Sequence, residues 1–596
     1  MCLNPIKITN PRKFKRLHLD SSDLYVNCNH CPECEAQLTN DWFVRLNYEY
    51  LNYKSKKGCV YFLTLTYNDA CVPMVTENDF IELTTRFNID APLFSGMCFN
   101  KKHIVQFFKD FRAFFKSKYG IDGIKHFTVT EYGTDPDKTH RPHYHMLLFF
   151  PVRFDPSIVR SVANYCWSER VPVQDVPDTI IKQSEYPDIQ NQIKRGNYNI
   201  LQRWIIAPPS SPRHKKPMYK RRYGFTSWSK NGAIVQSSAC LRYILKYLFK
   251  DRHFMSSSVG SGLEFILNRC PSLAILEEQF PPVDPLGCPD VNYQKQLEQG
   301  EDFFQTNPDF IKFHRLIQSV RDCLPFHLQS VKLGDTLFND IVSDWENGKK
   351  ILQNNVINFP QDINNYKVPR YIIRRLFYDV GKDKQNRHYA KYTNYVYLNE
   401  IGKECLIDFI DFKANRYNDY IDMYTSAYYV SLMSKEFVSG WYEKFGISFN
   451  ESLSQLRNLS LDTRELLFYY QLVFKDVFCF DARNLPSDVS SWLALGRDMY
   501  ISKVNTSDMR ELDTTYFELL PEYYRCSFDS NSVMDVHNII QFNDSSVFEN
   551  FDNYLLWLNG IREAVVTYKC QSKFEKYDRL KIIRSLYNRY IYKNYG

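Results

Sequence analysis

The stretch from His140 to Phe150 constrains the fold more than any other part of the chain. It reads His-Arg-Pro-His-Tyr-His-Met-Leu-Leu-Phe-Phe, and every position after His145 is apolar. An unbroken apolar run of this kind is typical of a strand covered on both faces. Residues i and i+2 of a strand point to the same face, so His143 and His145 should project side by side. The run predicts a buried strand with two imidazoles at its mouth.

Two imidazoles on one face can bind a divalent ion, and a third protein ligand is then expected nearby. Glu131 ends a predicted strand over residues 124–131, and a short loop joins this strand to the histidine strand. In an antiparallel hairpin its carboxylate would lie near both histidines. This ligand set suits Mg²⁺ or Mn²⁺ at a phosphodiester, and Zn²⁺ fits as well. The alternative is an ordinary histidine pair at a strand end, which an isolated His-x-His would favour.

Charge is distributed unevenly along the 596 residues. Residues 1–250 hold 36 Lys and Arg against 22 Asp and Glu, a net charge of +14, and the remaining residues have a net charge of −7. Residues 191–250 contain 13 basic residues and no acidic one. Such a window predicts a polyanion as partner, although a run of charge can also be a solvated face. The candidate phosphate contacts are Arg141, Arg213, Lys215, Lys216, Lys220, Arg221, Arg222, Arg242 and Lys250.

A tyrosine pair closes the basic window. Tyr243 and Tyr247 are four residues apart, which places them on one face of a helix predicted over residues 240–249, with Lys246 at its edge. A tyrosine can act as a covalent nucleophile when a metal-polarised phosphate and a neighbouring cation activate it. In a chain with 43 tyrosines, the alternative is a packed amphipathic helix.

The periodicity predicts an α+β fold with an antiparallel sheet and flanking helices, followed by a mostly helical region. The polar stretch 170–199 reads as an inserted loop, and 256–262, rich in Ser and Gly, as a flexible connector. Further predicted strands cover residues 60–67 and 143–150, and further helices cover 104–118, 453–474 and 551–595. We expect four regions: 1–58, 59–255, 256–385 and 386–596.

Three motifs resemble those of HUH endonucleases. They are Phe62-Leu-Thr-Leu-Thr-Tyr67, then Glu131-Tyr-Gly with Arg141-Pro-His-Tyr-His145, then Tyr243-x-x-Lys-Tyr247. Their order and spacing are most similar to replication initiators of microviruses, single-stranded DNA phages, and especially to the gokushovirus-like branch. The resemblance covers about residues 1–380 and leaves 386–596 without a match.

The resemblance implies a mechanism and a setting. Such initiators nick one DNA strand at a phage replication origin, keep the 5′-phosphate on a tyrosine and free a 3′-hydroxyl that primes rolling-circle synthesis. Carried over by position, Glu131, His143 and His145 bind the metal, Tyr243 and Tyr247 are the nucleophiles, and Lys246 contacts the scissile phosphate. The implied partners are single-stranded origin DNA and the helicase and polymerase of a bacterial host, in whose cytoplasm the protein would act.

Cysteines near the N-terminus form a second candidate metal site. Cys28, Cys31 and Cys34 follow a C-x-x-C-x-x-C pattern, and Cys2 could supply a fourth thiolate for a structural Zn²⁺. His30 is an alternative ligand, and the spacing also fits an iron–sulfur cluster. The alternative is a set of reduced, unliganded thiols, as expected in the cytosol.

Several functions compete with a replication initiator. A plasmid relaxase or a transposase would use the same chemistry, and a non-catalytic nucleic-acid-binding protein could keep the fold. A metalloenzyme unrelated to DNA is a further alternative. The sequence has no G-x-x-x-x-G-K-[ST] loop, which argues against an intrinsic NTP-driven helicase, and no apolar stretch approaches the ~18 residues that a membrane span needs.

Overall fold

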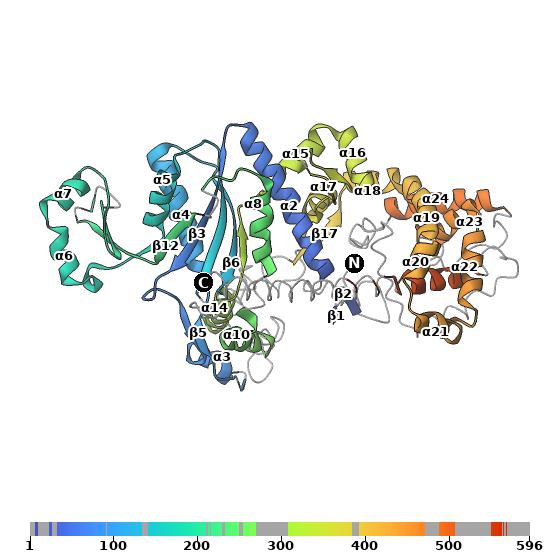
Figure 1. Cartoon of the computed structure of the whole chain (residues 1–596), viewed down its shortest axis with the longest axis horizontal. Coiled ribbons are helices and arrows are strands. Elements are labelled where there is room, and N and C mark those ends of the chain that lie inside the picture. Colours follow the sequence, from blue (N-terminus) through green and yellow to red (C-terminus); the bar gives the residue numbers. More distant parts are fainter. Residues whose placement is uncertain are drawn as a thin grey trace, which may run out of the picture. The chain divides into compact units, whose positions relative to one another are not determined.

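The chain forms two compact units in a computed structural model (Figure 1). One unit comprises Trp42–Asp340 with Asp383–Thr393, and the other comprises Met1–Asp41, Ile341–Lys382 and Asn394–Gly596. The structure describes residues 6–9, 23–26, 32–86, 88–90, 92–133, 141–209, 213–214, 216–228, 233–249, 254–269, 308–360, 362–383, 393–470, 488–506, 550–562, 564–565, 568 and 572.

A five-stranded antiparallel sheet forms the centre of the first unit (Figure 1). The predicted strands are present, and the predicted hairpin between the carboxylate strand and the histidine strand is confirmed. Their β-branched and aromatic composition suits a sheet that is buried on both faces. In spatial order the strands are β12 (Gly224–Trp228), β3 (Cys59–Tyr67), β7 (Pro142–Phe150), β6 (Lys125–Tyr132) and β13 (His327–Gln329).

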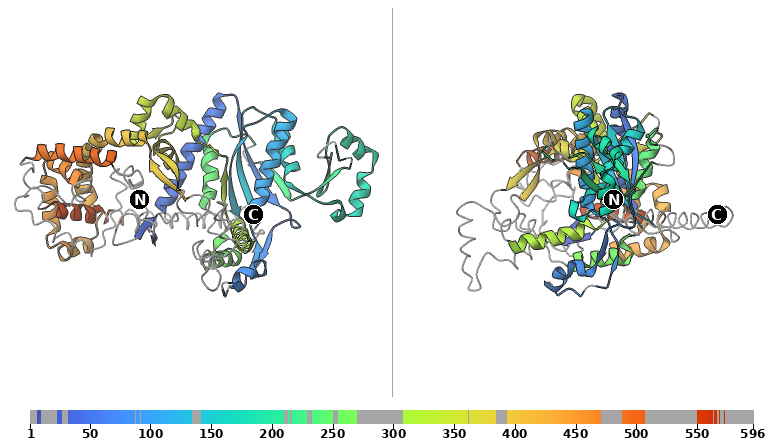
Figure 2. Two further views of the ribbon diagram at one scale, coloured as in Figure 1. Left: turned by 180° about the vertical axis from the view of Figure 1, so that it is seen from behind. Right: turned by 90° about the vertical axis from the view of Figure 1, so that its left-hand side faces the viewer.

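Alternation along the strands gives this sheet two different faces. Leu63, Tyr144 and Met146 belong to a large hydrophobic core that also contains the phenylalanine stripe of α4 (Lys101–Tyr119) and apolar residues of α5 (Pro156–Cys166). Side chains of the opposite face meet α2 (Pro32–Ser55) and α8 (Ser238–Leu245). There the ring centroids of Trp42 and Phe127 are 4.7 Å apart. Helices therefore cover both faces of the sheet (Figure 2).

The first unit has further elements that extend or flank this sandwich. The helix predicted over 104–118 is α4, with Asn100 as its N-cap and Gly120 in the left-handed conformation at its end. The remaining elements are β4 (Met74–Thr76), α3 (Ile81–Arg86), β5 (Ser95–Met97), α10 (Ser258–Arg269), α14 (Pro308–Asp322) and α15 (Asp335–Ser343), the last of which reaches the unit boundary.

Residues 170–199, predicted to be a loop, belong instead to a folded insertion. Four strands, β8 (Ser168–Arg170), β9 (Asn199–Leu201), β10 (Trp204–Ala207) and β11 (Met218–Arg222), form a sheet in the order β8-β11-β10-β9. The helices α6 (Asp178–Ser184) and α7 (Pro187–Lys194) accompany it. A small core of Val176, Ile189, Ile206 and Tyr219 holds the insertion together. The prediction failed because these apolar residues are sparse in the sequence and converge only after the strands pair.

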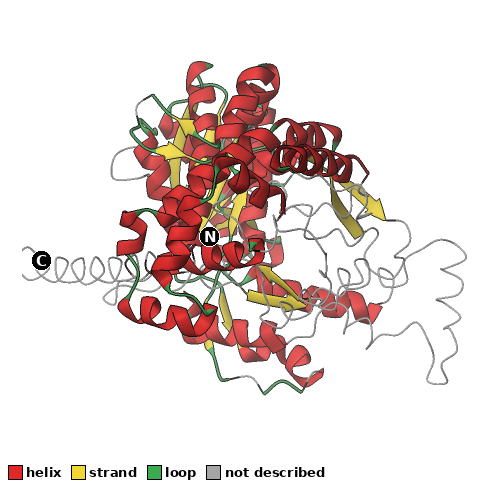
Figure 3. Ribbon diagram, turned by 90° about the vertical axis from the view of Figure 1, so that its right-hand side faces the viewer, coloured by secondary structure: helices red, strands yellow, loops and turns green. Residues whose placement is uncertain are grey.

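The described part of the second unit is mostly helical, as predicted (Figure 3). The helix expected over 453–474 is two helices instead, because the Ser460 side chain accepts a hydrogen bond from the Thr463 backbone and starts a new helix. None of the described helices is both long and apolar enough to cross a membrane. The helices are α16 (Trp345–Asn354), α17 (Arg370–Phe377), α18 (Glu400–Asp408), α19 (Ile410–Thr425), α20 (Ala427–Ser431), α21 (Lys435–Phe445), α22 (Phe449–Asn458), α23 (Leu461–Tyr469) and α24 (Val489–Thr506). Three strand pairs, β1 (Ile6–Thr9) with β2 (Asp23–Val26), β14 (Ile357–Asn358) with β15 (Asn365–Tyr366), and β16 (Tyr378–Asp383) with β17 (Thr393–Leu398), complete the described elements.

The prediction of a flexible connector at 256–262 is wrong. Most of this segment begins the helix α10, in which Gly260 and Gly262 are buried. A Cβ at Gly260 would lie 2.0 Å from the Phe254 carbonyl oxygen, and a Cβ at Gly262 would lie 2.3 Å from the Phe94 ring. These glycines permit close packing, so their small size rather than their flexibility explains their presence.

We therefore predict opposite effects of alanine at two helical glycines. Gly260→Ala should lower the free energy of unfolding by roughly 1–3 kcal/mol, because overpacking forces the backbone near Phe254 to move. Gly440→Ala in α21 should be neutral or raise it by up to about 1 kcal/mol, because nothing lies within 4 Å of the added Cβ. Thermal unfolding of the two variants measures this difference. Equal transition temperatures would show that Gly260 is not tightly packed.

Candidate functional site

The strand register places the predicted metal ligands on one face of the central sheet. Glu131 of β6 lies directly opposite His143 of β7, and Val129 lies opposite His145. On the other side of β7, Thr66 and Thr64 of β3 pair with the same two histidines. Directly paired residues of an antiparallel sheet project from the same face. Glu131, His143 and His145 therefore share the face that α8 covers.

His145 is held at both ring nitrogens. Its Nε2 lies 2.6 Å from Oε2 of Glu131, and its Nδ1 lies 2.9 Å from Oγ1 of Thr64. An ionised carboxylate can only accept, so Nε2 carries the proton in this arrangement. With a neutral ring, the Thr64 hydroxyl then donates to Nδ1. Only 8% of His145 is exposed, so solvent does not compete strongly for these bonds.

His143 presents its ring differently. Its Nδ1 lies 2.7 Å from the carbonyl oxygen of Arg141 and must donate to it, because a carbonyl only accepts. This bond leaves Nε2 as the nitrogen able to bind a ligand. Burial lowers the pKa of His143 below its ordinary value, partly opposed by the bond to the Arg141 carbonyl. The neutral form, which metal binding needs, is thereby favoured.

The donor set fits a divalent ion in its chemistry but is not assembled around one. Among the described residues, no three His, Cys, Asp or Glu side chains converge as a metal-binding group. Glu131 and His145 are instead bonded to each other. An ion bound by both would replace this hydrogen bond and release the Nε2 proton, as metal binding to imidazole generally does.

The tyrosine pair lies directly against this histidine. The Tyr247 ring stacks on the His145 ring, with centroids 4.2 Å apart and planes 21° apart. The hydroxyl of Tyr247 donates to the hydroxyl of Tyr243 at 2.5 Å. The predicted helix over 240–249 is α-helical only to Leu245, and a 3-10 turn, η3 (Lys246–Phe249), carries Tyr247.

The two tyrosines differ sharply in exposure. Tyr243 is 44% exposed, whereas Tyr247 is 7% exposed. Burial, together with the bond to Tyr243 and the charge of Glu131, raises the pKa of Tyr247 well above that of a free phenol. The ammonium of the exposed Lys246 lies 5.8 Å from the Tyr243 ring centroid. One phenol is therefore open to a substrate, and the other is held as a hydrogen-bond donor.

Several predicted phosphate contacts make internal contacts instead of standing open to solvent. Lys220 is 6% exposed, and its ammonium lies 4.1 Å from the Tyr165 ring centroid. Arg222 donates to the Asn164 side chain at 3.1 Å, and Arg141 bonds the Tyr67 carbonyl at 3.2 Å.

Other predicted contacts remain at the surface. Arg213, Lys216 and Arg242 are exposed, and the Arg242 guanidinium lies 4.7 Å from the Phe43 ring centroid. Arg221 is about half exposed and pairs with Glu169 at 2.7 Å. Lys215 and Lys250 lie outside the described residues.

The cysteine cluster is described at one residue only. Cys34 is buried at the start of α2, whereas Cys2, Cys28 and Cys31 lie outside the described residues. The zinc site stays a prediction.

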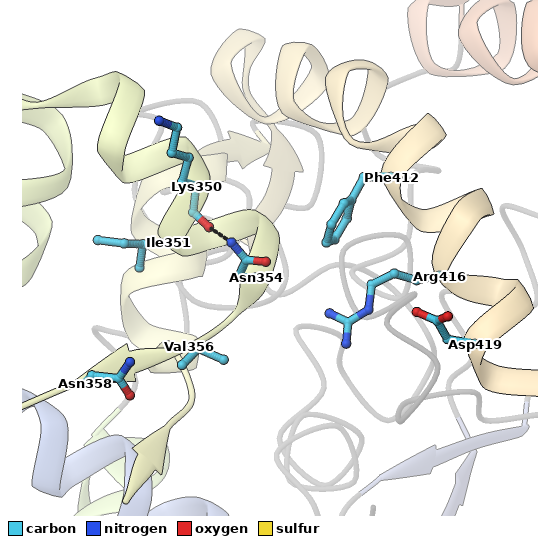
Figure 4. A pocket seen from close by; sticks show the side chains of 8 residues that line it. All are labelled: Lys350, Ile351, Asn354, Val356, Asn358, Phe412, Arg416 and Asp419. Carbon is cyan, nitrogen blue, oxygen red and sulfur yellow. Dashed lines mark hydrogen bonds between the residues drawn. The ribbon is translucent and has the colours of Figure 1, made fainter. Parts of the chain in front are cut away.

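A pocket of about 640 Å³ lies in the other unit (Figure 4). Arg416 and Phe412 of α19 point into it from one side and Asn354 of α16 from the other, while the Lys350 ammonium points away. Because none of the predicted site residues lines it, we do not connect it with the histidine and tyrosine cluster.

Thr64 is a site residue that sequence reasoning missed, although it lies in the motif Phe-Leu-Thr-Leu-Thr-Tyr. The signal was present: the threonines alternate with apolar residues at the same period of two as the histidines. What the sequence alone could not supply is the register, which pairs Thr64 with His145.

Residues 60–252 match the model of a protein family described as "Replication-associated protein ORF2". The match contains all three motifs and confirms the resemblance to replication initiators over these residues. It covers less than half of the chain. No curated protein and no solved structure matches the chain.

The role of Thr64 can be tested against its neighbour on the same strand. Thr64→Val should lower the free energy of unfolding by about 1–2 kcal/mol, because it removes the 2.9 Å partner of a buried imidazole nitrogen. Thr66→Val should cost less than about 0.5 kcal/mol, because the Thr66 hydroxyl makes only a 3.4 Å contact at an exposed position. Chemical denaturation measures both, and equal losses would contradict a specific role of the Thr64–His145 bond.

Proposed function

We propose that this chain is a replication initiator that nicks and rejoins single-stranded DNA at a phage origin through a tyrosine-linked 5′-phosphate. The observation that carries the proposal is the contact between the tyrosine pair and the histidines. Tyr247 stacks on His145 and donates to Tyr243, which is exposed on the same face. The match to a replication-associated family supports the same interpretation.

Glu131, His143 and His145 would hold the metal ion, for which we propose Mg²⁺ or Mn²⁺. A carboxylate oxygen and the two Nε2 atoms are the donors that their hydrogen bonds leave directed to one face. When bound, such an ion polarises the phosphoryl oxygens and orients the scissile group. The Arg141 carbonyl and the Thr64 hydroxyl would keep the two rings in place.

Tyr243 would make the first attack. Its oxygen forms a bond to the scissile phosphorus, the bond from phosphorus to the 3′ oxygen breaks, and that oxygen takes up a proton as the phenol loses one. The Tyr247 hydroxyl would stabilise the developing negative charge on the Tyr243 oxygen, because it already donates to that atom. Lys246, exposed beside Tyr243, would offset the charge of the phosphate.

Tyr247 would serve a second transfer. A second attack on the newly replicated origin releases a strand end whose 3′-hydroxyl can displace Tyr243 from the first phosphate and close the circle. Tyr247 must leave its stack on His145 to take part in this step. The order of the tyrosines thus follows from their difference in exposure.

The wider assignments follow from charge. Exposed Arg213, Lys216 and Arg242 are the phosphate contacts that we propose for single-stranded DNA, because their charges face solvent. Elongation would need the helicase and polymerase of a bacterial host, whose cytoplasm would be the site of action. For residues 386–596 we propose a separate region without an assigned role.

A covalent adduct would test the nuclease proposal. Protein incubated with labelled single-stranded origin DNA and Mn²⁺ should form a labelled band that survives denaturing electrophoresis. Tyr243→Phe should abolish it, whereas Tyr247→Phe should form it more slowly but lose the joined product. If wild-type protein forms no adduct, the nuclease proposal fails, and a non-catalytic DNA-binding protein becomes the better one. Adduct formation by Tyr243→Phe but not by Tyr247→Phe would reverse the order of the tyrosines.

Metal binding can be tested without turnover. Calorimetric titration with Mn²⁺ should show one site whose affinity falls at least about 10-fold in His143→Ala, since a ligand matters no less than the groups that orient it. His214→Ala, which removes an exposed histidine from the insertion, is the matched control and should bind as the wild type does. Equal affinities of His143→Ala and wild type would exclude His143 as a ligand.

A further inference from the structure

One aromatic side chain lies in the same cross-strand row as the predicted metal ligands. Phe225 of the edge strand β12 pairs with Thr66, Thr66 pairs with His143, and His143 pairs with Glu131. These four residues therefore form a continuous row across four strands. Phe225 is 59% exposed, in contrast to the buried aromatic residues of the same sheet.

The neighbours of Phe225 establish which face it occupies. The Thr226 hydroxyl bonds the Asn164 side chain of α5 at 2.7 Å, and Trp228 packs near Tyr61 of the large core. Even-numbered residues of β12 thus face α5. Phe225, between them, projects to the opposite face, where His143 and Glu131 lie.

A solitary exposed apolar residue is common on protein surfaces, and edge strands more often carry charged residues. Three observations separate Phe225 from that background. It ends the row of the predicted ligands, and within the described residues its ring makes no aromatic contact. It also follows directly on Arg221 and Arg222, within the basic window of residues 191–250 that contains no acidic residue.

We propose that Phe225 is a stacking platform for a nucleobase of the single strand next to the scissile phosphate. This inference rests on the proposed nuclease function. Two strand spacings of about 4.8 Å separate Phe225 from His143, so their Cα atoms lie roughly 10 Å apart. A phosphate held at His143 leaves the base of an adjacent nucleotide within reach of the Phe225 ring. Stacking on an aromatic face tolerates any base, so Phe225 contributes affinity and positioning rather than sequence choice.

The test uses full-length protein and a fluorescently labelled oligodeoxythymidylate, followed by anisotropy at fixed salt. Phe225→Leu keeps an apolar side chain without a ring face and should weaken binding between about 5-fold and 150-fold, whereas Phe225→Trp should restore wild-type affinity. Tyr442→Leu is the matched control, because Tyr442 is a similarly exposed aromatic residue, 65% exposed on α21. It should bind as tightly as wild type. Thermal unfolding of each variant establishes that the fold is intact.

The outcomes separate this inference from the nuclease proposal. If wild-type protein forms the covalent adduct but Phe225→Leu binds the oligonucleotide as tightly as wild type, the stacking role is overturned and the nuclease function stands. Equal losses in Phe225→Leu and Tyr442→Leu also overturn it, because the effect is then not specific to the row. If Phe225→Leu alone weakens binding while wild-type protein forms no adduct, the nuclease proposal fails and the stacking contact remains.

Discussion

The antiparallel register of β6, β7 and β3 is the constraint on which the rest of the candidate site depends. It pairs Glu131 with His143 and Thr64 with His145, and it brings Phe225 into the same row through Thr66. A shift by one residue would turn both histidines into the apolar core. Burial on both faces prevents such a shift, because Tyr144 and Met146 would then be displaced from that core.

The same burial creates the asymmetry of the tyrosine pair. Tyr247 lies against His145 because the helix α8 tightens into a 3-10 turn after Leu245 and packs on the sheet. Tyr243, one turn earlier, remains at the surface. Two residues of identical chemistry thus acquire different environments, one as an accessible phenol and the other as a buried donor. In the proposed reaction, this difference orders the two transfers in time.

The insertion and α10 show where local sequence misleads. Residues 170–199 are polar and contain prolines, and nevertheless they contribute helices and strands, because four apolar residues distant in sequence meet in a common core. Likewise, Gly260 and Gly262 in a serine-rich stretch suggest flexibility, yet both lie in a helix against Phe254 and Phe94. In both cases the deciding partner is remote along the chain, so composition alone cannot reveal it.

The sequence by itself determined the central strands, the β6–β7 hairpin and the identity of the histidine and tyrosine candidates. These depend on periodicity and on spacing within a few residues, which local patterns carry. Only the tertiary structure decided that Thr64 holds His145, that Tyr247 is buried while Tyr243 is exposed, and that Lys220 is enclosed beside Tyr165. Each of these depends on pairing or packing between segments far apart in the chain, whose geometry no local pattern encodes.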